Sequence, residues 1–325
     1  PRLHLTLSGY LMFTNNEVRS PPYPEEYHVS SFMPQFGPPD CPAVPANPYQ
    51  WREGVVSDDT VMGQDFAAEM GGGNSVHLIT RDDANPQVVK ETLYAIGGVE
   101  HGVDDKPCPC VEDDVFASDR VIRISDPDPT TAWEGAGTGT APKNLNHARV
   151  NANSIVLLDG SILVVGGADR DPETVLECDD MYYSDACLYR KVPELYKPPE
   201  VFEGLVQTSW NNMAPQAGRR RYHSVAGMLP DGRVFSAGGT APGDQKTVEL
   251  FSPPYFFRGP RPSIETEFDA AQAYGTVATI RVNLRGGGGQ AAVKRVALIR
   301  NVAVTHAFDM NQRYVEVPIV SVPDP

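Results

Sequence analysis

The chain has 325 residues, a hydrophobic content of 41% and a formal net charge of −15. This length and content can build a large core and exclude wholesale disorder. The acidic balance argues against a nucleic-acid partner, because phosphate binding needs clustered Lys and Arg. No apolar run approaches the ~18–20 residues that cross a bilayer, so no membrane span is predicted.

A strand–turn–strand unit that often closes on a Gly pair recurs along the chain. Its copies lie at 3–13, at 74–79 with 93–98, at 154–167, and at 225–239. In the last copy, Pro230-Asp231-Gly232 is the turn between two apolar strands, and Gly238-Gly239 ends the second strand. Repeats of this kind predict the blades of an all-β propeller.

Other segments between the hairpins are predicted from their composition. Residues 17–55 are expected to be loop, because their prolines interrupt strands and helices. Residues 99–120 are an acidic loop, and 168–200 an insertion. Residues 119–124 and 248–251 are predicted outer strands.

The pattern changes after Ser252-Pro253-Pro254-Tyr255. Strand-like runs at 275–284, 293–300 and 314–322, joined by Gly-rich turns, predict an immunoglobulin-like β-sandwich. We therefore divide the chain into a partial propeller at 1–251 and a C-terminal domain at 252–325. Because Pro1 stands directly before a blade-like strand, we expect further blades upstream.

The chain contains five cysteines, at Cys41, Cys108, Cys110, Cys178 and Cys187. Cys178 and Cys187 flank a short loop, and a disulfide between them is the favoured interpretation. Cys108 and Cys110 could pair with each other, or one of them with Cys41. A zinc site is a weaker alternative, since no second ligand pair stands at a familiar spacing. Disulfides would indicate a location outside the cytosol.

Three residues are candidates for metal chemistry. Tyr222 and His223 stand where the inner strand of the last hairpin begins, and His306 lies in the C-terminal domain. Neighbours on a strand point to opposite faces, so Tyr222 and His223 can share a metal only where the strand bends or starts. Two His nitrogens with a Tyr oxygen form a set that suits Cu(II). On composition alone each His is more simply explained as a structural residue.

The motif Arg221-Tyr-His-Ser-Val-Ala-Gly-Met-Leu-Pro-Asp-Gly-Arg-Val-Phe-Ser-Ala-Gly-Gly239 resembles the last-blade motif of the copper radical oxidases, the galactose oxidase and glyoxal oxidase family. Residues 249–257 resemble the passage from the propeller of that family to its immunoglobulin-like domain. Thr305-His306, followed by Gln312-Arg313, resembles the segment that inserts a second His ligand. The three matches occur in the order and spacing of the family.

The resemblance implies a kelch-type propeller, seven-bladed in the intact protein, with one copper ion held by Tyr222, His223 and His306. Tyr222 would also be the base for the substrate proton. The Tyr–Cys radical cofactor of the family has no counterpart at a suitable position here, so it is expected only upstream. Asn151 and Arg149, on the neighbouring blade, are weaker candidates for substrate contact.

The function implied is a secreted oxidase that acts with O2 on a primary alcohol, an aldehyde or a carbohydrate and releases H2O2. The alternative is a non-catalytic extracellular propeller with a structural, carbohydrate-binding or self-assembly role. The acidic and Pro-rich insertions would suit such a protein and its extracellular assembly partners. An intracellular kelch adaptor is disfavoured by the C-terminal domain and the cysteines.

Overall fold

A computed structural model describes 2–7, 11–18, 26–33, 73–101, 115–127, 131, 133–135, 141–169, 189–202, 209–241, 243–266, 271–273, 275–285, 293–305, 307–309 and 312–320. Within these ranges the chain is built from strands, with one short 3-10 helix, η3 (Pro254–Phe257). The all-β prediction is confirmed for the described residues.

The N-terminal half of the chain forms two sets of three antiparallel strands. The first comprises β1 (Arg2–Leu5), β2 (Leu11–Val18) and β3 (Glu26–Met33). The second contains β4 (Asn74–Arg81), β5 (Val89–His101) and β6 (Val115–Ser125). A buried polar cluster lies between them, in which His4 Nε2 is 2.7 Å from Ser75 Oγ and His77 Nε2 is 2.6 Å from Glu91 Oε1.

The next two sheets carry the hairpins with Asp-Gly turns. One has β7 (Val150–Val156), β8 (Ile162–Ala168), β9 (Glu194–Tyr196) and β10 (Asn211–Asn212) in sequence order from β7 outward. The other has β11 (Ser224–Met228), β12 (Val234–Gly238) and β15 (Val248–Phe251), beside the small pair β13 (Thr240–Ala241) and β14 (Gly243–Asp244).

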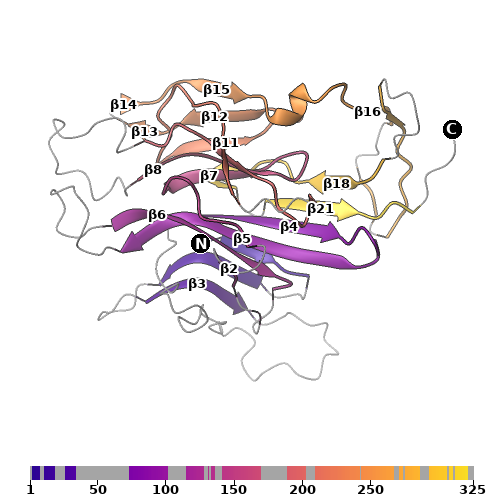
Figure 1. Cartoon of the computed structure of the whole chain (residues 1–325), viewed down its shortest axis with the longest axis horizontal. Coiled ribbons are helices and arrows are strands. Elements are labelled where there is room, and N and C mark those ends of the chain that lie inside the picture. The colour runs from indigo at the N-terminus through magenta and orange to yellow at the C-terminus, as the bar shows by residue number, and fades with distance from the viewer. Residues whose placement is uncertain are drawn as a thin grey trace.

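Figure 1 shows these sheets stacked in layers, from β2 and β3 at one end to β12 and β15 at the other. The first strands of successive sheets lie next to one another, β4 against β7 and β7 against β11. Apolar side chains fill the spaces between the layers. One core cluster includes Val76, Tyr94 and Val164, and the next joins Leu163 of β8 to Ala226 and Val234.

The C-terminal strands lie beside the ends of these layers (Figure 1). They are β16 (Ser263–Ile264), β17 (Val282–Asn283), β18 (Val296–Ile299), β19 (Val304–Thr305), β20 (Phe308–Asp309) and β21 (Arg313–Val317). β18 pairs with β21, and β21 pairs in parallel with β4, so that Arg313 lies opposite His77. Strands from both sides of the predicted domain boundary therefore share one five-stranded sheet. The boundary at 251/252 itself remains a prediction.

Four sequence-based expectations are wrong in detail. The loop predicted at 99–120 is shorter, because β5 extends to His101 and β6 begins at Val115. Of the strand predicted at 275–284, only Val282 and Asn283 form a strand.

Residues 17–55 were expected to be loop, but β3 pairs with β2 along its length. The prolines at 21, 22 and 24 fall before this strand and do not interrupt it. The insertion is shorter than the predicted range 168–200, because β9 within that range is the third strand of its sheet. The four predicted hairpins and both outer strands are confirmed.

Candidate functional site

Tyr222 and His223 lie side by side at the start of β11. Their ring centroids are 3.9 Å apart and the ring planes are inclined by 31°. His223 has a left-handed φ of 61°, and β11 begins only at Ser224. The backbone therefore turns at this point, which lets two consecutive side chains occupy the same region. The side chain of Tyr222 is half-buried, and that of His223 is exposed.

Asn151 occupies the corresponding position on the neighbouring sheet. Its φ is 55°, and it stands directly before Ala152, which pairs with Gly166. His223 stands in the same way before Ser224, which pairs with Gly238. Asn153 joins the two strands, since its Nδ2 donates to Ser224 Oγ at 3.1 Å and its Oδ1 accepts from Ala226 N at 3.1 Å. Asn151 and His223 therefore project from matched positions on adjacent inner strands.

The C-terminal hairpin β19–β20 reaches this same place. Ala307, the residue after His306, donates its N–H to the carbonyl of Ser224, the residue after His223, at 3.1 Å. Val302 packs so closely on Gly227 that a Cβ there would come within 2.4 Å of Val302 Cγ2. His306 lies outside the described residues. Its chain neighbours are thus held against β11, next to the start of the strand.

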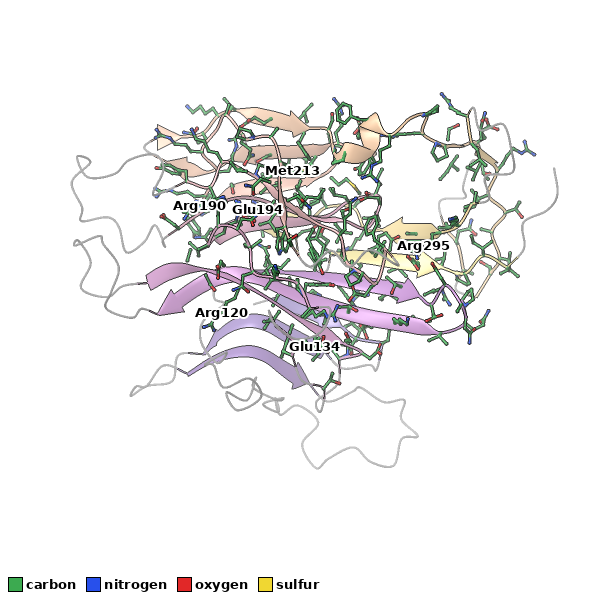
Figure 2. All side chains as sticks on the ribbon, viewed as in Figure 1. Arg120, Glu134, Arg190, Glu194, Met213 and Arg295 are labelled. Carbon is green, nitrogen blue, oxygen red and sulfur yellow. The ribbon has the colours of Figure 1, made fainter. Side chains whose placement is uncertain are left out.

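Arg149 has an internal position. The residue as a whole is 1% exposed, and its guanidinium donates to the carbonyl of Gly166 at 2.7 Å and to Glu194 Oε1 at 2.8 Å. Glu194 lies inside the sheet stack (Figure 2). These bonds fix the entry of β7 to β8 and β9. Substrate contact by Arg149 stays a prediction that this burial does not favour.

The donor set at this position fits a copper ion in its chemistry. Tyr222 supplies a phenol oxygen and His223 an imidazole nitrogen, and mixed oxygen and nitrogen ligands suit Cu(II). Among the described residues, no group of three or more His, Cys, Asp and Glu side chains could hold a metal ion. Such a group would not include Tyr222, and His306 is not described.

A cavity of about 520 Å³ lies elsewhere in the molecule. It is lined by residues of the turns after β7 and β11, among them Asp159 and Pro230, and by Arg295, Ile299 and Tyr314 near β18 and β21. Figure 2 shows Arg295 beside these strands. Because Met228 and Pro230 stand at the far end of β11 from Ser224, this cavity is not the site formed by Tyr222 and His223.

Two further predictions concern the cysteines and the absence of a membrane span. Cys41, Cys108, Cys110, Cys178 and Cys187 all fall outside the described residues, so the disulfides remain predictions. Across the described ranges, no helix has the length and apolar character needed to cross a membrane. Asn153 and Gln312 were given no anchoring role in the sequence analysis, because the groups that they bond lie far away in the chain.

The sequence is similar to those of known proteins. Residues 261–324 match the family model of the galactose oxidase-like Early set domain. A galactose oxidase from Gibberella zeae is 26% identical over 221 residues, which cover 65% of this chain and 28% of that protein. The chain is a homologue of the galactose oxidase and aldehyde oxidase proteins.

Plant relatives show the same pattern. Aldehyde oxidase GLOX1 of Arabidopsis thaliana is 28% identical over 179 residues, or 51% of this chain and 27% of the relative. Aldehyde oxidase GLOX of Vitis pseudoreticulata is 25% identical over 268 residues, or 78% and 45%. The chain thus spans less than half the length of these curated relatives.

A solved structure of similar fold is a fungal alcohol oxidase of the AA5 family in complex with copper. It matches with a TM-score of 0.60 and 19% identity over 97% of this chain and 53% of that one. The similarity of fold confirms the predicted architecture, in which propeller sheets are followed by a C-terminal β domain. The number of blades in the intact protein stays a prediction.

Proposed function

We propose that this chain belongs to a secreted copper radical oxidase and supplies three ligands of its copper ion. The ligands are Tyr222, His223 and His306. The observation that carries the proposal is the bond from Ala307 N to Ser224 O, which brings the neighbours of His306 to the neighbours of His223. The relatives named galactose oxidase and aldehyde oxidase, and the copper in the similar fungal structure, support it.

The reaction is oxidation of a primary alcohol to an aldehyde, or of an aldehyde hydrate to an acid. In each case two electrons and two protons pass from the substrate to O2, giving H2O2. Copper, when bound, supplies one-electron oxidation next to the substrate. The Tyr222 oxygen accepts the substrate hydroxyl proton, and the Asn151 amide, at the matched position on the next strand, orients the substrate.

We assign the role of second electron acceptor to a Tyr–Cys cofactor, and we place this cofactor in sequence upstream of this chain. The sheet of β11, β12 and β15, here called the last sheet, has an open face that supports the proposal of further blades. Val248 is 67% and Leu250 53% exposed there. An apolar face of this kind is ordinarily covered by another sheet. The cysteines support a secreted location, because disulfides persist outside the cytosol.

The test uses the intact protein reconstituted with Cu(II), with metal analysis, EPR and H2O2 release on primary alcohols and aldehydes. We expect one copper per protein, loss of the Cu(II) signal with His223→Ala, and a rate about 10²–10⁴-fold lower with Tyr222→Phe. His147→Ala is the control, since His147 lies outside the ligand set, and it should retain copper. A wild-type protein that binds no copper would contradict the proposal and leave the non-catalytic alternative.

A further inference from the structure

The described residues of the segment from Val302 to Gln312 contact the strands β11 and β7 of two neighbouring sheets. At one end, Val302 packs on Gly227 of β11, and Ala307 donates to Ser224. Within the segment, β19 and β20 pair as Val304 with Asp309 and Thr305 with Phe308. At the other end, the chain continues into β21, which pairs with β4.

Gln312 provides the contact with the edge of β7. Its Nε2 donates to the carbonyl of Ser154 at 2.8 Å, and its Oε1 accepts the N–H of Val156. Among the described strands, β7 is the terminal strand of its sheet, and none pairs with it on the side opposite β8. A carboxamide carries the same donor and acceptor as a peptide group. The side chain of Gln312 therefore takes the place of a strand on this edge.

The environment makes both hydrogen bonds important. Gln312 is only 4% exposed, and water cannot readily replace the bonds that it makes. Asp309 supports the same segment, because one of its carboxylate oxygens accepts the N–H of Ala303 at 3.0 Å. The segment is thus fixed before and after residue 306 by contacts with different sheets.

We propose that Gln312 is a positioning residue for His306: by bonding Ser154 and Val156 on the edge of β7, it sets how the segment that carries His306 meets Tyr222 and His223. This inference rests on the proposed copper site. Partners that orient a metal ligand without touching the metal commonly change metal affinity about 10–100-fold when they are replaced.

The test compares Gln312→Met with Asn74→Leu. Both substitutions replace a buried carboxamide that bonds to β7 by an apolar side chain of similar size. Asn74 is 3% exposed and donates to Ala152 O, but it lies on β4 and not on the segment. Copper affinity is measured by competition with a chelator, the copper environment by EPR, and the metal-free segment by hydrogen exchange of peptides from 302–311.

We expect Gln312→Met to weaken Cu(II) binding by about 10–100-fold, to change the EPR spectrum and to speed exchange in 302–311. Asn74→Leu should lower the Tm but leave the copper affinity, the EPR spectrum and the exchange in 302–311 unchanged. Wild-type copper binding in Gln312→Met, or an equal loss in both variants, would overturn the inference. If Gln312→Met does not fold, Gln312→Glu keeps the size and one acceptor, and the same readouts apply to it.

The two proposals fail in different ways. If the wild-type protein binds no copper, the proposed function fails, and exchange in the metal-free variants still decides whether Gln312 holds the segment. If wild-type copper binding depends on His223 but not on Gln312, the function stands and the positioning role is wrong.

Discussion

The sheets of β7–β10 and of β11, β12 and β15 contain the same Arg–Glu arrangement in two different surroundings. Arg149 bonds Gly166 O and Glu194, and both ionic side chains are 0% exposed. Arg220 bonds Gly238 O at 2.9 Å and Glu249, whose side chain is 28% exposed. In each sheet the Arg lies before or at the start of the first strand. Its guanidinium bonds to the first Gly of a Gly-Gly pair on the second strand and to a Glu on the third strand, β9 or β15.

The difference follows from the neighbours of each sheet. The β7–β10 sheet is enclosed by the layers on either side, and every residue of β7, β8 and β9 is buried. Among the described residues, one face of the last sheet packs against the rest of the molecule, and Val248 and Leu250 are exposed on the other. Tyr222 and His223 thus stand directly before the first strand of the less protected sheet. We expect the Arg–Glu pair of the enclosed sheet to contribute more to stability than the pair of the last sheet.

The largest expected effect is on the enclosed ion pair. Glu194→Ala leaves the Arg149 guanidinium buried without its carboxylate, which should cost about 3–5 kcal/mol of unfolding free energy. Urea unfolding measures this loss. Glu249→Ala is the matched control and should cost clearly less, since solvent reaches its carboxylate. Equal losses in the two variants would contradict the comparison.

A smaller effect is expected where the C-terminal segment packs on the last sheet. Gly227→Ala places a methyl group 2.4 Å from Val302 Cγ2, and overpacking of this kind costs about 1–3 kcal/mol. Val302→Ala removes both opposing Cγ atoms and leaves only Val302 Cβ, 2.9 Å from the added methyl group. The double variant should therefore recover part of the loss, and a double-mutant cycle of unfolding free energies measures the coupling. Additive losses would show that the two residues do not press on each other.

The smallest effect is a pH dependence of the last sheet. Burial raises the pKa of Glu249, but the N–H groups of Ala217 and Gly218 and the Arg220 guanidinium together lower it below its ordinary value of 4.5. A lowered folded pKa stabilises the protein above pH 4.5, and this contribution is lost as pH falls through the folded value.

Glu249→Gln should remove this dependence, which we expect to be about a few tenths of a kcal/mol because the carboxylate is partly exposed. Thermal melts of the wild-type protein and the variant, at a series of pH values from above 4.5 downward, provide the measurement. A wild-type slope that persists unchanged in Glu249→Gln would assign the effect to another carboxylate.

The hairpins could be predicted from sequence because their determinants are local. Asp159-Gly160 and Asp231-Gly232 mark turns, and the apolar strands on either side need no distant partner to be recognised. The confirmed resemblance to galactose oxidase and aldehyde oxidase proteins also rested on three short stretches of sequence, each recognisable locally.

Features that depend on residues far apart in the chain were not predictable in the same way. The pairing of β21 with β4 joins Arg313 to His77, and no local pattern selects that edge. The left-handed backbone at Asn151 and His223 was also unmarked, since neither residue is glycine. The bonds of Gln312 to Ser154 and Val156 likewise join residues far apart in the chain.

The attachment of β21 to β4 also affects the order in which the protein is made. A ribosome adds ~5–20 residues per second, so on the order of tens of seconds separate the synthesis of His77 from that of Arg313. During that time the edge of β4 has no strand to pair with and can associate with other chains. We therefore expect nascent chains to depend on protection of this edge, and truncations that remove 313–317 to aggregate even though β4–β6 is complete.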